Sequence, residues 1–336
     1  MKTVDLRSDT VTRPSAAMLE TMIRAQLGDD VFGDDPTANS LEAHAAALLG
    51  FEAALFVPSG TQSNLCGLMA HCQRGDEYLV GQHAHTYKYE GGGAAVLGSI
   101  QPQPLEHEPD GTLALGRIEA AIKDHSDSHF ARTRLLALEN TFHGRVLPLP
   151  YLEAATGLAR SRGLATHLDG ARLFNAAVKS GVPAREIARH FDSVSVCLSK
   201  GLGAPVGSVL CGSKSLIASE RRWRKVLGGG MRQAGVLAAA GIYALANNVA
   251  RLAEDHARAA RLGEGLVNYS WLELEKPQTN IVFVRLPKER GARLLAHLKS
   301  HGVLATGDAV IRLVTHLDVD DAGIVQTLAA FGTFKP

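Results

Sequence analysis

From about residue 50 onward, short apolar and β-branched runs alternate with longer helical patterns. Three such runs are each followed by a helical pattern: 54–57 by 62–73, 134–138 by 152–162, and 164–168 by 184–190. Two further runs, at 193–198 and 206–210, are continuous enough in apolar character to be buried on both faces. This alternation predicts an α/β fold in which a mostly parallel sheet is flanked by helices.

The C-terminal third has a different pattern. The stretch from Gln233 to Leu266 predicts one long helix, in which small apolar residues give way to charged pairs. After it the pattern predicts strand, helix, strand and helix at 281–286, 291–300, 310–314 and 320–331, the order of a compact α+β unit. We therefore expect two domains: residues 1–250, which include an irregular N-terminal arm, and a smaller domain at 251–336.

Composition and charge narrow the class of protein. The 336 residues include 46% hydrophobic and 21% charged residues, as in globular enzymes. Because 35 basic residues balance 34 acidic ones, we expect a small-molecule partner, with neither nucleic acid nor membrane. The four cysteines (Cys66, Cys72, Cys197 and Cys211) form no CxxC pair, so we expect reduced thiols, a cytoplasmic location and no metal site.

Three predicted strands end in residues that could act together. Lys200 follows the run at 193–198, and burial against a sheet favours the neutral amine that forms a Schiff base. Asp169 ends an earlier strand, and Gly60 and Thr61 follow another at a helix start that can bind an anion. Taken singly, these residues are also typical of a surface lysine and of helix caps. Together at one sheet edge they indicate pyridoxal phosphate: phosphate on the helix start, Asp at the pyridine nitrogen, Lys in the Schiff base.

Five longer segments carry a resemblance to a known family. They are 5–14, 28–36, 167–172, 199–203 and 228–233. With them the chain resembles, nearly end to end, the low-specificity L-threonine aldolases, pyridoxal-phosphate enzymes of the aspartate-aminotransferase fold type, also called fold type I. The resemblance implies retro-aldol cleavage of L-threonine and L-allo-threonine to glycine and acetaldehyde. It also implies a homotetramer or homodimer whose active sites lie at subunit interfaces.

The resemblance assigns roles to residues at the matching positions. Those implied to hold the cofactor are Lys200, Asp169, Gly60, Thr61, Arg172, Lys225, Arg232 and His85, the last stacked on the ring. Ser8, Arg172 and Arg312 resemble the group that grips the substrate carboxylate, a task suited to the planar fork of arginine. Arg312 is also compatible with an ordinary outward-facing position on a strand.

Two histidines are candidates for the base that takes the proton of the β-hydroxyl group. They are His85 and His129, and an ordered water or the released Lys200 amine are alternatives that the sequence does not rank. The main competing function is another enzyme of the same fold type, a β-eliminating lyase or an aminotransferase. A non-catalytic protein that binds an anion through the basic cluster at 221–225 is a further alternative, disfavoured by the complete set of lysine, aspartate and arginine.

Overall fold

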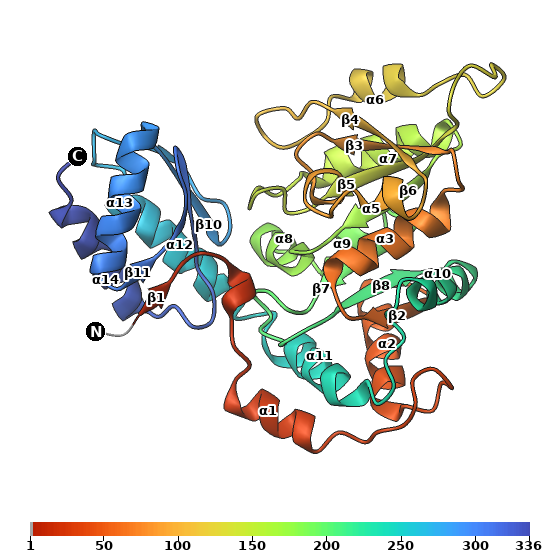
Figure 1. Ribbon diagram of the computed structural model, residues 1–336, viewed down its shortest axis with the longest axis horizontal. Coiled ribbons are helices and arrows are strands. Elements are labelled where there is room, and N and C mark those ends of the chain that lie inside the picture. The colour runs from red at the N-terminus through yellow and green to blue at the C-terminus, as the bar shows by residue number, and fades with distance from the viewer. Residues whose placement is uncertain (1–2) are drawn as a thin grey trace.

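The computed structural model describes residues 3–336, which form a larger and a smaller unit around separate sheets (Figure 1). The larger sheet has seven strands in the order β2-β8-β7-β6-β5-β3-β4. Their bounds are β2 Ala53–Val57, β3 Glu77–Gly81, β4 Gln101–Leu105, β5 Thr133–Glu139, β6 Ala165–Asp169, β7 Ser193–Cys197 and β8 Ser208–Gly212. Neighbours from β4 to β7 are parallel, whereas β8 is antiparallel to both β7 and β2. The predicted α/β fold with a mostly parallel sheet is confirmed, although β3 and β4 were not predicted.

Helices cover both faces of this sheet because successive strand residues point to opposite sides. In β2, Ala54 and Phe56 join the core on one face, whereas Leu55 and Val57 join the core on the other. The first face is covered by α2 Pro36–Leu49, α7 Leu149–Ser161, α8 Leu173–Ser180 and α9 Ala184–Ala188. The second face is covered mainly by α3 Gly60–His71 and α10 Lys214–Val226. Three short helices, α4 His85–Lys88, α5 Gly93–Val96 and α6 Leu115–Ala121, lie in the connections.

The long helix predicted at 233–266 is wrong: two helices occupy this stretch. They are α11 Gly235–Asn247 and α12 Leu252–Leu266, which meet at an angle of 69°. At the break, Asn248 donates a side-chain hydrogen bond to the Leu202 carbonyl, at 2.7 Å, so the turn is tied to another segment rather than continued as helix. Within the described residues, no single helix is long and apolar enough to cross a membrane, and α11 and α12 meet that test only as a bent pair.

The smaller unit contains a four-stranded antiparallel sheet in the order β12-β13-β10-β9. Its strands are β9 Glu273–Glu275, β10 Ile281–Arg285, β12 Thr306–Gly307 and β13 Val310–Val314. Packed with it are α12, α13 Lys288–Ser300 and α14 Asp321–Thr333. We keep the boundary near residue 250 as our proposal, since it falls in the break between α11 and α12.

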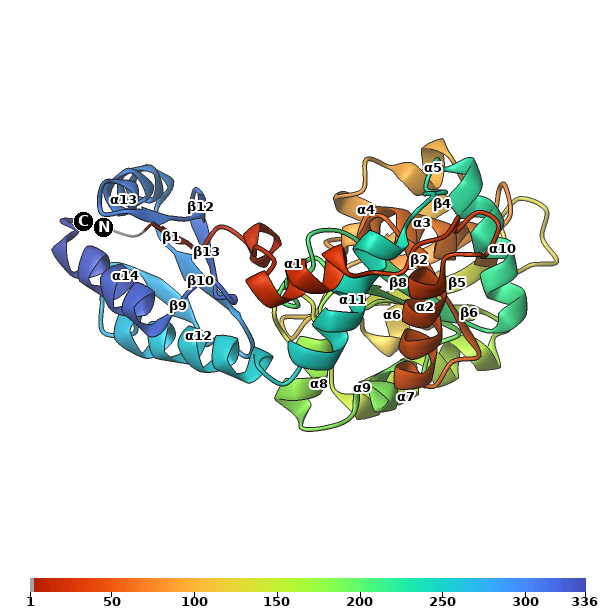
Figure 2. The same ribbon diagram turned by 90° about the horizontal axis from the view of Figure 1, so that it is seen from below.

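The N-terminal arm connects the two units (Figure 2). Strand β1 Val4–Asp5 pairs in parallel with β11 Val303–Leu304 of the smaller unit, although the sequence prediction grouped the arm with the larger one. The short 3-10 helix η1 Asp9–Val11 follows, and α1 Ala16–Ile23 then packs against α11. The arm therefore contacts the smaller unit first and the larger unit afterwards, and η1 lies between these contacts.

Candidate active site

Parallel strands β5, β6 and β7 end at the same sheet edge and bring polar side chains together there. Glu139 and Asp169 are paired neighbours at the ends of β5 and β6. Lys200 is half-buried and lies three residues beyond β7, where its carbonyl accepts a hydrogen bond from the Gly203 amide at 2.9 Å. This placement agrees with the sequence prediction that Asp169 and Lys200 emerge at one edge.

Asp169 lies in a cluster of carboxyl groups that the sequence did not reveal. Its side chain is 3% exposed, and Asn64 Nδ2 donates to Asp169 Oδ2 at 3.0 Å and to Glu90 Oε1 at 2.8 Å. The same Glu90 oxygen lies 2.7 Å from Nδ1 of His85, and the His85 amide donates to Glu139 Oε2 at 2.8 Å. Asn64, Glu90 and Glu139 come from α3, the loop after α4 and β5, so no local pattern joins them.

The cluster holds more carboxyl groups than cations. Burial, followed by repulsion from Asp169, raises the pKa of Glu139 to about 7. Burial also raises the pKa of Glu90, and the hydrogen bond with Glu90 raises the pKa of His85. A positively charged group bound beside Asp169 would therefore be stabilised here. The ligand atoms of His85, Glu90 and Asp169 lie within 4.8 Å of one another, so the only metal-like cluster found among residues 3–336 is this same site.

The start of α3 has the features that the predicted anion-binding cradle requires. Ser59 Oγ accepts from the Gln62 amide at 3.2 Å, and first-turn amides such as those of Gly60 and Thr61 have no partner within the helix. A side chain at Gly60 would approach Cys197 Sγ to 2.6 Å, so only glycine fits without displacement. The glycine run at 228–230 lies directly against the start of α3: a Cβ on Gly229 would collide with the Gln62 side chain, so a residue larger than glycine would not fit there.

The basic cluster at 221–225, in the last turns of α10, is divided between buried and exposed positions. Arg224, which was not predicted, is 2% exposed, pairs with Asp30 at 2.7 Å and donates to the Phe56 carbonyl at 2.8 Å. Lys225 is exposed and lies beside Gly230 in the glycine run that borders the cradle. Arg232 has a 55% exposed side chain and pairs with Asp29 at 3.0 Å. In a single chain neither Lys225 nor Arg232 is enclosed in the cluster around Asp169.

Arg172 is held by a buried ion pair with the N-terminal arm. Its Nε and Nη2 atoms donate to the two oxygens of Asp9 at 2.7 and 2.6 Å, and Asp9 also accepts from Asn280 of the smaller unit at 3.1 Å. Burial would raise the pKa of Asp9, but attraction to Arg172 holds it well below its usual value. Ser8 caps η1 by accepting from the Thr10 amide at 3.2 Å. Asp9 thus joins the arm and both units at one point, a role the sequence did not reveal.

Arg312 on β13 faces the same region from the smaller unit. Its Nη2 donates to the Arg7 carbonyl at 3.3 Å, and burial followed by repulsion from Arg172 lowers its pKa. No carboxylate pairs with Arg312 within 4.0 Å among the described residues. Of the two arginines predicted to bind the substrate carboxylate, Arg172 is paired with Asp9, whereas the guanidinium of Arg312 is available to a ligand.

A cavity of about 280 Å³, lined by aromatic and charged side chains, includes Phe283, the strand partner of Arg312, and was not predicted. Its lining includes His83, Tyr89, Phe142, His143 and Phe283. The Phe142 and His143 rings are 4.5 Å apart, and burial lowers the pKa of His143 to about 4. His143 is therefore a neutral imidazole near physiological pH.

His129 lies apart from these residues within one chain. It follows α6 in a loop that projects from the larger unit (Figure 1), and its side chain is 87% exposed. Its Nδ1 pairs with Asp127 at 2.6 Å. The structure thus brings His85 into the cluster around Asp169 and does not bring His129 there.

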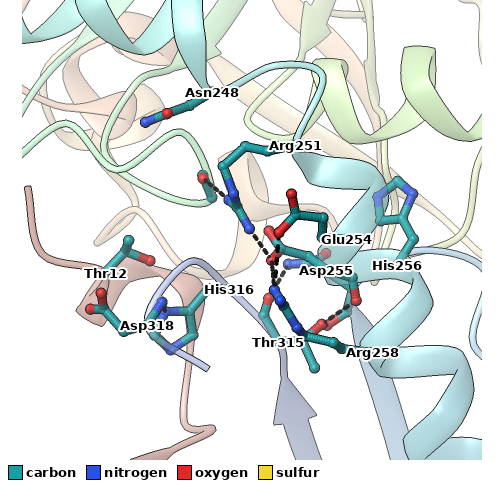
Figure 3. Close-up of polar contacts among 12 residues, drawn as sticks. Thr12, Asn248, Arg251, Glu254, Asp255, His256, Arg258, Thr315, His316 and Asp318 are labelled. Atoms are coloured by element: carbon teal, nitrogen blue, oxygen red, sulfur yellow. Dashed lines mark hydrogen bonds and ion pairs between the residues drawn. The ribbon is translucent and has the colours of Figure 1, made fainter. Parts of the chain in front are cut away.

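The turn after Lys200 is anchored to the break between α11 and α12 (Figure 3). Arg251 Nη1 donates to the Gly201 carbonyl at 3.3 Å, and its Nη2 pairs with the buried Asp255. The Asp255 carbonyl accepts from Thr315 Oγ1 at 2.6 Å, and Thr315 follows β13, which carries Arg312. One polar network therefore links the lysine turn to the strand that presents Arg312.

Comparison with known proteins agrees with this arrangement. The family described as "Beta-eliminating lyase" matches residues 5–289. The chain is 55% identical to the "Low specificity L-threonine aldolase" of Escherichia coli (strain K12), over 98% of this chain and 99% of that protein. It is 46% identical to a "Probable low-specificity L-threonine aldolase 2" of Arabidopsis thaliana, over 98% and 97%. A Leishmania major threonine aldolase structure shares the fold, with a TM-score of 0.85, 22% identity and 98% coverage of both chains. The chain therefore belongs to the beta-eliminating lyase family and, within it, to the low-specificity L-threonine aldolases.

Proposed function

We propose that this chain uses pyridoxal phosphate to cleave L-threonine, L-allo-threonine and related L-β-hydroxy-α-amino acids into glycine and an aldehyde. The observation that carries the proposal is the convergence of Lys200, Asp169 and the α3 cradle at one sheet edge, facing Arg312. The family membership supports the same activity.

The residues present fit pyridoxal phosphate. The α3 amides at Gly60 and Thr61 suit its phosphate, and glycines in and opposite the cradle leave the space that side chains would fill. A protonated ring nitrogen beside Asp169 would balance a cluster rich in carboxyl groups, and Lys200 supplies the amine for covalent attachment. When bound, the cofactor attaches the substrate amino group and accepts the electron pair released as the Cα–Cβ bond breaks.

Substrate orientation is assigned to Arg312, with Arg172 and Ser8 beside it. Because Asp9 occupies Nε and Nη2 of Arg172, we assign the bidentate grip on the substrate carboxylate to Arg312. Asp9 fixes the position of Arg172, whose positive charge adds to the attraction for the carboxylate. Holding the carboxylate restricts rotation about the substrate backbone and so determines which bond is aligned to break.

His85 is the histidine that we assign to the pocket. Its Nδ1 is occupied by Glu90, which orients the ring and leaves Nε2 as the second nitrogen. From its place beside Asp169, His85 would contact the cofactor ring or take the proton of the β-hydroxyl group. The released Lys200 amine and a water are alternative bases. His129 is exposed in its loop, so within one chain we expect it to contribute much less than His85.

Two variants test this assignment. We expect His85→Asn to lower kcat by more than about tenfold, which corresponds to about 1.4 kcal/mol of barrier, and by more than His129→Asn does. The measurement is the pH profile of aldehyde release for both variants. Equal losses in the two variants would show that the base was assigned wrongly.

The proposed reaction is tested by spectroscopy followed by product analysis. We expect the purified protein to show the visible band of bound pyridoxal phosphate, and borohydride followed by peptide mapping to trap the cofactor on Lys200. Addition of L-threonine should then release acetaldehyde and glycine. Release of ammonia and a keto acid instead would favour the competing β-eliminating or aminotransferase activity. A protein that never acquires the band would refute the proposal.

We also propose a homo-oligomer in the cytoplasm. Ile23, Leu27 and Phe32 of the N-terminal arm have 79%, 51% and 76% exposed side chains, an apolar surface that a second subunit would bury. Lys225, in the last turn of α10, and Arg232, in the segment that follows, are both exposed and therefore accessible to a neighbouring subunit. The four unpaired, buried cysteines support a reducing compartment. Light scattering would distinguish dimer from tetramer.

A further inference from the structure

A line of hydrogen bonds runs from Asp169, at the C-terminal end of β6, between the sheet and α3 to the start of β7 and the end of α3. Asn64 donates to Asp169, and Asn64 Oδ1 lies 3.3 Å from Nε2 of His167. Nδ1 of His167 lies 2.7 Å from Ser193 Oγ, which in turn lies 2.8 Å from Nε2 of His71. His71 ends α3 and lines a surface cavity of about 470 Å³ on that far side.

Both histidines in this line are neutral. Burial lowers the pKa of His167 to about 3 and that of His71 to about 4. His167 is fully buried and packs against α3 at Gly67, where a Cβ would approach its ring to 2.8 Å. A neutral imidazole has one N–H donor and one acceptor nitrogen, so each ring must be ordered in a single tautomer.

The contacts determine the direction of every hydrogen bond in the line. The Asn64 amide nitrogen must face the carboxylates of Asp169 and Glu90, because carboxylates accept. Its oxygen therefore accepts from Nε2–H of His167, whose Nδ1 must then accept from the Ser193 hydroxyl. The Ser193 oxygen is left to accept from Nε2–H of His71. Every donor points towards Asp169.

We propose that Asn64, His167, Ser193 and His71 are positioning residues that form a one-way relay of donors and keep Asp169 an acceptor. The consequence is that the proton shared by Asp169 and the cofactor ring nitrogen rests on the nitrogen, where it strengthens the ring as an electron acceptor. This inference rests on the proposed function, because it requires pyridoxal phosphate beside Asp169.

Other ionisable groups also face Asp169, and the relay is distinct from them. Glu90 and Glu139 add negative charge, whereas His85 and Lys200 add positive charge. None of these four belongs to the line from Asn64 to His71. Substitution of a relay residue beyond Asn64 therefore leaves these four charged groups in place. At the far end of the relay, Asp192 is the acidic group that acts on His71, and its attraction raises the pKa that burial lowers.

The test is a pH titration of the visible band of the bound cofactor. A proton on the ring nitrogen disfavours protonation of the nitrogen that joins the cofactor to Lys200, through Coulomb repulsion. In His167→Leu the relay is cut and the shared proton moves towards Asp169, so we expect the midpoint of the titration to rise by about one pH unit. His167→Gln places an amide donor near the Nε2 position and should restore the midpoint to within about 0.3 unit.

Controls separate the relay from a general structural effect. The same titration with a cofactor analogue that has carbon in place of the ring nitrogen should give one midpoint for all variants. His256→Leu removes a half-buried histidine paired with an asparagine, Asn175, and should leave the midpoint unchanged with either cofactor. Ser193→Ala cuts the relay one step further away, so we expect a smaller rise of the same sign, and it serves if His167→Leu does not fold.

The outcomes are decisive in both directions. An unchanged midpoint in the relay variants, or an equal shift with both cofactors, would overturn the relay. Ring-15N-labelled cofactor gives a second readout, since its resonance should move towards the unprotonated position in His167→Leu. The titration requires no turnover, so failure to release acetaldehyde from threonine would refute the proposed reaction without altering the result for the relay.

Discussion

Asp9→Asn is predicted to be one of the most damaging single substitutions outside the strands. Asp9 is fully buried, forms two hydrogen bonds to Arg172 at 2.6 and 2.7 Å, and accepts from Asn280 at 3.1 Å. An amide of the same volume keeps the packing but removes the charge opposite Arg172. Breaking a buried pair by removing one partner costs about 3–5 kcal/mol, because the remaining charge is left uncompensated. We expect this loss in the free energy of unfolding.

The arm itself supplies a matched control. Asp5 pairs with Arg7 at 2.5 Å in the same segment, but the two side chains are 23% and 47% exposed. Exposed pairs contribute under about 1 kcal/mol, so Asp5→Asn should be nearly neutral. Urea unfolding followed by the fluorescence of Trp271 in the smaller unit and Trp223 in the larger one measures both variants. A loss below about 1 kcal/mol for Asp9→Asn, or equal losses for the two variants, would refute the burial argument.

The pH dependence provides a second check on Asp9. Its pKa is lowered on folding, because attraction to Arg172 outweighs burial, so the unfolded chain binds the proton more readily. The stabilisation is therefore complete above the ordinary pKa of 3.8 and is lost as the pH falls from there towards the lower folded-state value. The difference in stability between the wild type and Asp9→Asn should narrow below about pH 3.8. A constant difference down to pH 2 would contradict this assignment.

Three further predictions concern other parts of the structure. Glu220 is fully buried with no hydrogen-bond partner among residues 3–336, and burial raises its pKa to about 8. Between its ordinary pKa of 4.5 and 8, the free energy of unfolding of the wild type should fall as the pH rises, by up to about 1.4 kcal/mol per pH unit. Glu220→Gln should flatten this slope when stability is measured by urea unfolding at several pH values. Gly60→Ala should weaken cofactor binding by at least about tenfold because its Cβ meets Cys197, whereas Gly116→Ala, which has open space, should not; equal binding in a fluorescence titration would contradict the cradle. Arg312→Lys should raise KM for threonine by about tenfold or more with a smaller change in kcat, since it loses the bidentate grip; an unchanged KM would move this role to another residue.

The sequence was sufficient for the residues that follow directly from strand ends. Lys200, Asp169 and Gly60 each lie just beyond an apolar run, and parallel strands bring their carboxyl ends to one edge whatever the rest of the fold does. Local composition was not sufficient for β4, whose sequence Gln101–Leu105 contains two prolines. Proline is tolerated there because β4 is the edge strand of the sheet and some of its amides need no partner.

The tertiary structure alone decided what surrounds those residues. In the sequence, Asn64 and Glu90 are ordinary polar residues of a helix and a loop. Only in the folded chain does Asn64 donate hydrogen bonds to both Asp169 and Glu90. Asp9 reads as part of a polar arm, yet it becomes fully buried when the arm passes between the two units. The direction of β8 and the break at Asn248 likewise depend on neighbours distant in the chain. Periodicity and strand ends are properties of consecutive residues, whereas burial and charge pairing depend on contacts between remote segments. The sequence therefore determined which candidate groups share the sheet edge, and the fold determined which charges and hydrogen bonds surround them.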